Sequence, residues 1–199
     1  NEKGEREVTE GDMIVIEGGD TALVIAQTNV RANMKSTAPT METRNATYVF
    51  PHVRQTIEDA WQRAGVSGIG QISGVETHDC FTTTQYMAID HLGLTPPGQS
   101  WQAVEDGSIE RGGRCPVNMS GGLIGCGHPV GATGARMLLD AARQVTAQAQ
   151  ACQIEGAQRM QTLNIGGSCA TVVSFVVEAG ACRFSPHACA GETGVLKAR

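Results

Sequence analysis

The sequence has no long apolar run, few aromatic residues and no concentration of basic charge. No stretch of the 199 residues approaches the roughly eighteen uninterrupted apolar residues that a membrane-spanning helix requires, and the charged first ten residues do not resemble a signal peptide. The 15 lysines and arginines are scattered and are outnumbered by 20 acidic residues, so we expect no nucleic-acid partner. Aromatic residues make up only 4% and glycine contributes 25 residues, which favours close packing of helices on a sheet over a sandwich core.

The sequence also lacks the common metal and nucleotide motifs. Its seven cysteines form no CxxC pair and no zinc-type spacing, so we interpret them as free thiols of a reducing intracellular compartment and expect no metal site. There is no GxxxxGKS or GxxxxGKT loop, and the glycines at 121–134 do not follow the dinucleotide fingerprint. We therefore expect no permanently bound cofactor.

Apolar patterns predict the first half of the fold. Residues 13–16 and 21–26 read as short buried strands in the middle of a sheet, joined by a turn at Gly18-Gly19. Residues 27–50 read mostly as loop. After Pro51 and before Gly65, apolar residues recur at spacings of three and four, which predicts an amphipathic helix.

Strands and helices alternate over the remaining residues. We expect a strand over 72–77, a helix that ends at Gly93, and a loop over 96–118. A long helix is predicted from its apolar stripe over 135–149. Two last strands are expected over 161–165 and 171–177. This alternation predicts one α/β layered domain.

Two short segments carry histidines with possible catalytic roles. His128 follows a glycine run and precedes Pro129, where the long helix is expected to begin, and the positive end of a helix would keep its imidazole neutral and able to accept a proton. The alternative is a histidine that only caps the helix. His78, Asp79 and Cys80 follow a strand at a junction that commonly faces a cleft, so Cys80 is a candidate acid/base thiol; a buried structural cysteine is the alternative.

A third segment, Asn164-Ile165-Gly166-Gly167, joins the last two strands. Glycine there allows backbone N–H groups to approach a ligand closely, as an oxyanion hole requires. Taken alone, the segment predicts only a turn.

Together and in this order, the three segments resemble the catalytic loops of a thiolase C-terminal domain. The matching residues are His78-Asp79-Cys80-Phe81, Gly127-His128-Pro129-Val130-Gly131-Ala132-Thr133-Gly134 and Asn164-Ile165-Gly166-Gly167. The resemblance extends from about residue 12 to residue 178. It implies a layered thiolase-like α/β domain, with a mixed, mostly five-stranded sheet and helices on both faces, the C-terminal half of the αβαβα thiolase fold. The first and third loops are most similar to the sterol-carrier-protein type of thiolase.

The resemblance also implies a role for each residue. His128 would activate the nucleophilic cysteine, and His128 and His78 would hold the thioester oxygen. Gly166 would offer its backbone N–H to a second oxyanion hole, and Cys80, not Cys169, would move the proton at the substrate's α carbon. The same comparison implies substrate-binding positions at Asn164, Gly127 and Pro129.

The implied activity is acyl transfer between a 3-oxoacyl-CoA and coenzyme A, by thiolysis or by the reverse Claisen condensation, with coenzyme A as substrate. The family's acyl-accepting cysteine lies on an N-terminal thiolase domain, so we expect the isolated chain to be inactive and the complete enzyme to be a homodimer or homotetramer. Two alternatives stay open, namely a thiolase-like aldolase acting on sterol side-chain thioesters and a non-catalytic acyl-CoA or lipid-binding module.

The predicted organisation has three parts. Residues 1–11 form a leader from the domain junction, residues 12–178 form the thiolase C-terminal domain, and residues 179–199 form a C-terminal extension. The resemblance implies a peroxisome, glycosome or mitochondrion as the compartment, or the cytoplasm of a bacterium.

Overall fold

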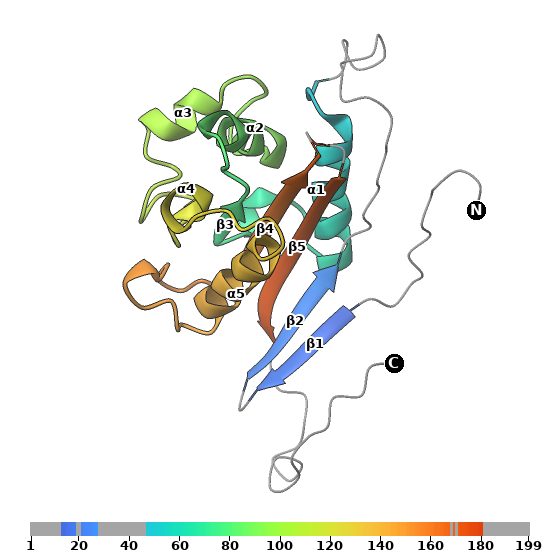
Figure 1. The fold of residues 1–199 in the computed structure, drawn as a ribbon, viewed down its shortest axis with the longest axis vertical. Coiled ribbons are helices and arrows are strands. Elements are labelled where there is room, and N and C mark those ends of the chain that lie inside the picture. Colours follow the sequence, from blue (N-terminus) through green and yellow to red (C-terminus); the bar gives the residue numbers. More distant parts are fainter. Residues whose placement is uncertain (1–12, 19–20, 28–46, 168, 170, 181–199) are drawn as a thin grey trace, which may run out of the picture.

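The strands form one mixed sheet in the order β1-β2-β5-β4-β3 (Figure 1). The computed structural model describes residues 13–18, 21–27, 47–167, 169 and 171–180. Neighbouring strands are antiparallel except for β3 and β4, which are parallel, so their carboxyl ends meet at the same end of the sheet. The strands are β1 (Met13–Gly18), β2 (Thr21–Gln27), β3 (Gly74–Thr77), β4 (Arg159–Gly166) and β5 (Thr171–Gly180).

Helix α1 (Pro51–Ala64) covers one face of this sheet. Pro51 suits its first turn, and Gly65 ends it in the left-handed conformation at φ +64°. Its buried stripe includes Ile57 and Trp61, and the Trp61 indole donates a 3.0 Å hydrogen bond to the fully buried side chain of Gln161 on β4. The prediction of an amphipathic helix before Gly65 is confirmed.

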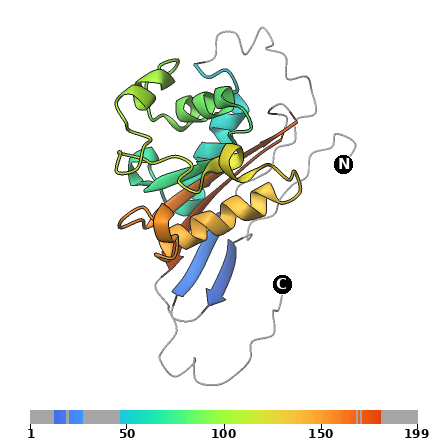
Figure 2. The same ribbon diagram turned by 60° about the vertical axis from the view of Figure 1, so that its left-hand side comes forward.

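Helix α5 (Thr133–Val145) covers the opposite face (Figure 2). Ala141 and Val145 pack with Met160 of β4 and Val177 of β5. Because strand side chains alternate between faces, Met160 lies under α5 while its neighbour Gln161 lies under α1. The predicted α/β layering, with helices on both faces, is confirmed.

Helices α2, α3 and α4 lie on the side of the sheet where β3 forms its edge (Figure 1). Ile89 and Leu92 of α2 are buried in the same core cluster as α1. In chain order the remaining helices are η1 (Ile69–Gln71), α2 (Thr82–Leu92), α3 (Ser100–Glu105), α4 (Gly122–Cys126) and η2 (Gln150–Cys152).

Four details differ from the sequence prediction. Strand β1 is at the edge of the sheet and not in its middle. The predicted loop over 96–118 contains α3, whose six residues are too few to show a helical repeat. The long helix ends at Val145, not at residue 149. It begins at Thr133, so His128 lies in the preceding loop and not at the helix start.

The predicted domain limits fall mainly outside the described residues. The leader at 1–11 and residues 181–199 of the extension lie outside the described residues, as does most of the predicted loop over 27–50. Strand β5 continues to Gly180, so the first two residues of the predicted extension belong to the sheet. Among the helices of the described ranges, none combines the length and apolarity of a membrane span.

Candidate active site

His78 and Gly166 are brought together by the parallel pairing of β3 and β4. His78 follows β3 directly, and its backbone N–H donates a 3.0 Å hydrogen bond to the carbonyl of Leu163 on β4. Gly166 is the last residue of β4, so the first and third predicted loops leave the sheet side by side. The topology therefore places a histidine and a glycine turn at the mouth of one cavity.

His128 reaches the same place from the loop between α4 and α5. Its ring lies edge-on to the ring of His78, with 4.7 Å between centroids and an interplanar angle of 89°. Gly127, which precedes this residue, has a positive φ of 83°, a conformation that glycine adopts without steric cost. Two imidazoles from segments 50 residues apart in the sequence thus share one site.

The contacts of Thr133 define which nitrogen of His128 carries the proton. The Thr133 hydroxyl donates to the carbonyl of Pro129 at 3.1 Å and lies 2.6 Å from Nδ1 of His128. Because its single hydrogen is used on Pro129, the hydroxyl accepts from Nδ1–H. The neutral ring then has its free lone pair on Nε2, which is the nitrogen able to accept a proton.

His78 is nearly buried, with 8% of its surface exposed. Burial lowers its pKa below the ordinary 6.5, the nearby His128 lowers it further, and Asp79 opposes the shift. His78 is therefore neutral at neutral pH. Its Nδ1 is buried without a hydrogen-bond partner among the described residues.

Two thiols line the cavity. Cys80 is half-buried, and its Sγ lies 3.8 Å from Oγ1 of Thr84. Cys169 is 5% exposed, and burial, with a smaller contribution from Cys80, raises its pKa, so it stays a neutral thiol. The imidazole of His52 hydrogen-bonds the backbone carbonyl of Cys169.

The cavity has a volume of about 910 Å³ and contains most of the predicted site residues. Of the residues predicted from the sequence, His78, Cys80, His128, Asn164 and Gly166 line it. Gly127 and Pro129, which are also described, flank His128 and are not among the lining residues. Phe81, Thr84, Val130 and Thr133 also line the cavity, and the sequence prediction assigned no site role to them.

Val130 and Phe81 are exposed by 83% and 70%, so the mouth of the cavity is apolar. Both belong to the catalytic-loop segments, so their closeness in sequence to Cys80 and His128 could have indicated that they line the site. An apolar wall with a few fixed polar groups is typical of small-molecule sites.

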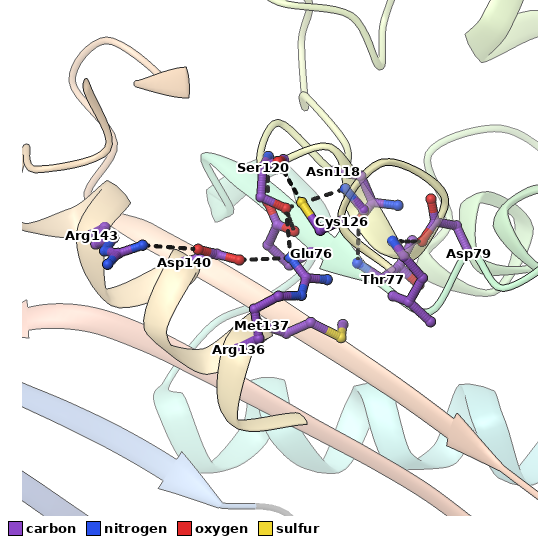
Figure 3. A network of polar contacts seen from close by, with 12 residues as sticks. Glu76, Thr77, Asp79, Asn118, Ser120, Cys126, Arg136, Met137, Asp140 and Arg143 are labelled. Carbon is purple, nitrogen blue, oxygen red and sulfur yellow. Dashed lines mark hydrogen bonds and ion pairs between the residues drawn. The ribbon is translucent and has the colours of Figure 1, made fainter. Parts of the chain in front are cut away.

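Asp79 has a structural place behind the cavity. It is 4% exposed, and its Oδ1 accepts a 2.6 Å hydrogen bond from the backbone N–H of Leu123 in α4. Next to it, the side chain of Asn118 accepts a 2.7 Å hydrogen bond from the backbone N–H of Thr77 (Figure 3). These bonds join β3 to the segment that leads to His128. Nothing in the sequence pattern indicated them.

Comparisons with known proteins agree with this arrangement. Residues 33–179 match the family described as "Thiolase C-terminal domain-like". The chain is 42% identical over 107 residues to an acetyl-CoA acetyltransferase of Methanothermobacter thermautotrophicus, an alignment that covers 54% of this chain and 28% of that protein. It is 34% identical over 126 residues to sterol carrier protein 2 of Homo sapiens, covering 63% of this chain and 23% of that protein.

A third relative and a solved structure extend the comparison. Benzoylsuccinyl-CoA thiolase subunit BbsB of Thauera aromatica is 36% identical over 117 residues, which cover 57% of this chain and 30% of that protein. A solved structure titled "Ltp2-ChsH2(DUF35) aldolase" is similar with a TM-score of 0.64 at 20% identity, covering 78% of this chain and 38% of that one. That likeness shows the fold. The aligned part of the chain spans less than a third of each of these three curated relatives.

Proposed function

The chain belongs to the thiolase family through its C-terminal domain, and we propose that it supplies the acid/base and oxyanion groups for acyl transfer between a 3-oxoacyl-CoA and coenzyme A. The observation that carries this proposal is the contact between the rings of His78 and His128, whose centroids are 4.7 Å apart. Both rings line a cavity that Cys80 and Gly166 also line. Enolate chemistry needs a poised base and fixed donors where negative charge develops. These residue types meet both needs.

In the proposed mechanism His128 acts first as a base. Its Nε2 accepts the proton of a cysteine thiol on the N-terminal thiolase domain, and the resulting Nε2–H then donates to the thioester oxygen. The Thr133 hydroxyl keeps the other ring proton on Nδ1 and so orients the imidazole. His78 is a second polar group at this oxygen, and its low pKa makes it a neutral donor.

Cys80 and Gly166 are proposed to act at the other end of the substrate. The Cys80 thiol exchanges the proton at the α carbon as the carbon–carbon bond breaks or forms, and the backbone N–H of Gly166 donates to the second thioester oxygen. Among the described residues, Gly166 ends β4 beside Asn164, and an added Cβ there would meet only Thr171, at 3.9 Å. Asn164 is a further polar group for substrate binding in the cavity.

The N-terminal thiolase domain is the proposed partner. The relatives are several times longer than the aligned region, and the apolar cavity mouth at Phe81 and Val130 faces solvent in this chain. Coenzyme A is the proposed cosubstrate, and the complete enzyme is proposed to be a homodimer or homotetramer. The free thiols among the described residues favour a reducing compartment, such as a peroxisome, a mitochondrion or bacterial cytoplasm.

Measurement of thiolysis tests the proposal. In a protein with the N-terminal half restored, we expect acetoacetyl-CoA and a long 3-oxoacyl-CoA to be cleaved only when coenzyme A is present. His128→Ala and Cys80→Ala are each expected to lower kcat by about a hundredfold or more, since that is what a positioned acid/base group contributes. Cys152→Ala is the matched control, because Cys152 is a free thiol in η2 away from the cavity.

Each outcome separates the proposal from its alternatives. Retro-aldol cleavage without coenzyme A would favour the aldolase alternative, since a solved structure titled as an aldolase shares the fold. Binding of acyl-CoA with no turnover would favour the binding module. A fully active Cys80→Ala enzyme would remove the assignment to the sterol-carrier type, and a fully active His128→Ala enzyme would remove the proposed mechanism.

A further inference from the structure

A buried carboxyl group lies in the strand that leads to His78. Glu76 is in β3, two residues before His78, and none of its surface is exposed. Both of its carboxyl oxygens accept from Ser120, one from the hydroxyl at 2.6 Å and one from the backbone N–H at 3.2 Å (Figure 3). Glu76 does not line the cavity, so the proposed acyl transfer makes no direct use of it. A buried acid at this position calls for another function, because its desolvation is costly.

Ser120 joins three parts of the fold. Besides Glu76 of β3, its hydroxyl accepts a 3.0 Å hydrogen bond from Arg136 of α5. Arg136 also pairs with Asp140 at 2.7 Å on the same helix. The backbone carbonyl of Ser120 accepts from the thiol of Cys126 at 3.2 Å, at the end of α4. One serine therefore connects the strand before His78, the helix after His128 and the short helix between them.

The segment between Ser120 and His128 has little stability of its own. It consists of the five-residue α4 flanked by Gly121 and Gly127, both with positive φ. One short helix with glycines at its ends does not hold itself in place in water. Its position depends on bonds to the rest of the molecule, and the bonds of Ser120 are at its start.

We propose that Glu76 is a positioning residue: through Ser120 it holds the segment 120–128 against β3, so that the ring of His128 meets the ring of His78. This inference rests on the proposed function, in which the two histidines act on the same thioester. Arg136 assists from the opposite side by fixing the Ser120 hydroxyl. The arrangement preorganises the pair before substrate binds.

The charges around Glu76 are consistent with this role. Burial raises its pKa from 4.5 to about 7. The hydrogen bonds from Ser120 lower the pKa, Asp140 raises it and Arg136 lowers it, each by less than burial raises it. The protonated carboxyl still has an acceptor oxygen for the Ser120 N–H and gains an O–H for its hydroxyl. Glutamine has the same donor and acceptor pattern, so Glu76→Gln is expected to preserve the position of the segment.

The position of the histidine rings can be measured in this chain without any turnover. We would record ring carbon–proton NMR spectra of the parent, Glu76→Ala and Glu76→Gln chains, with the signals assigned from His78→Gln and His128→Gln. In Glu76→Ala, both ring signals are expected to move, and the pKa of His78 to rise towards its ordinary value as His128 moves away. Glu76→Gln is expected to keep the parent signals.

Glu178→Gln is the matched control, since Glu178 is also on a strand and pairs with an arginine, Arg159, at 2.6 Å. Its substitution is expected to leave both histidine signals in place. Ser120→Ala is the second test, because it removes the shared hydroxyl but keeps the buried Glu76 side chain. It tests the proposal if Glu76→Ala does not fold. Unmoved signals of His128 in a folded Glu76→Ala or Ser120→Ala chain would overturn the proposal.

Kinetics of the protein with its N-terminal half give a second readout. Glu76→Ala is expected to lower kcat about tenfold or more while KM changes less than about threefold, because misplaced catalytic groups cost rate more than binding. Glu76→Gln is expected to restore most of the rate. An inactive parent would remove the proposed function but not the NMR result. An active parent with an unchanged kcat in Glu76→Ala would contradict the positioning role.

Discussion

Glu76 in β3 and His78, the residue that follows β3, are both shifted towards their neutral forms. Burial raises the pKa of Glu76 to about 7, and burial lowers the pKa of His78. The Glu76 carboxyl binds Ser120, and the His78 imidazole lines the cavity. Burial in this part of the molecule therefore disfavours the charged form of both groups.

The raised pKa of Glu76 predicts a pH-dependent stability. Its unfolded value is 4.5 and its folded value about 7, so between these values the folded chain binds more protons than the unfolded chain. The stabilising contribution is present in full below pH 4.5 and is lost as the pH rises to about 7. Glu76→Gln removes this loss. The difference in free energy of unfolding between Glu76→Gln and the parent is therefore expected to be about 2 kcal/mol larger at pH 8 than at pH 5, in favour of Glu76→Gln. This follows from roughly 1.4 kcal/mol per pKa unit.

Urea unfolding of both chains at the two pH values measures this gain. Glu178→Gln, at a partly exposed ion pair, is expected to follow the parent at both pH values. Equal changes in the parent and in Glu76→Gln between pH 5 and pH 8 would show that Glu76 does not titrate in this range.

Some site residues could be predicted from the sequence because they lie at the ends of strands, which the sequence pattern reveals. His78 and Cys80 lie just beyond a strand, and Gly166 ends another, so parallel pairing of the two strands suffices to bring them together. The bonds of Glu76 and Asn118 have no such signal. Each joins β3 to a residue about 40 positions away through a single side chain, which no periodic pattern reveals.

At the scale of elements, α4 is fixed by a close contact rather than by its length. Gly122, its first residue, has φ +62°, and a Cβ added there would lie 2.2 Å from Oδ2 of Asp79. Gly122→Ala must therefore displace the carboxylate that accepts from Leu123 or strain the backbone. We expect it to lower the free energy of unfolding by about 1–3 kcal/mol.

Gly125→Ala is the control for this prediction. Gly125 is in the same helix, has no positive φ, and a Cβ there would meet nothing within 4 Å. Alanine is expected to be neutral or slightly stabilising at this position. Denaturant unfolding of the two variants compares them directly, and a Gly122→Ala chain as stable as Gly125→Ala would contradict the tight contact with Asp79.

The accuracy of the element predictions followed the strength of the local signals. Helix α1 begins with Pro51 and ends at Gly65, and both ends were predicted. In α5, apolar residues occur on more than one side, since Leu139 is 50% exposed whereas Met137 is fully buried. A helix with two apolar faces does not reveal which one meets the sheet.

At the scale of the whole molecule, the state of its thiols limits what this chain does alone. A thiolase needs a second cysteine that accepts the acyl group, activated by a lowered pKa or an adjacent base. Cys115 is buried, with its pKa raised to about 12, and the pKa of Cys169 is also raised. Cys126, at the end of α4, and Cys152, in η2, are both outside the cavity. Among the described cysteines, only Cys80 and Cys169 line the cavity, and Cys80 is the more exposed of the two.

We therefore expect the 199-residue chain to form no acyl-enzyme with acetyl-CoA and to show no thiolysis. Intact-mass measurement after incubation with acetyl-CoA, followed by peptide mapping, checks this. With the N-terminal half restored, one acetyl group is expected on a cysteine of that half, and His128→Ala should slow its transfer because the thiol loses its base. Acetylation of Cys80 in the chain alone, or thiolysis by the chain alone, would contradict the proposal. Cys80 would then be the nucleophile, and the acyl-accepting cysteine would not belong to the N-terminal domain.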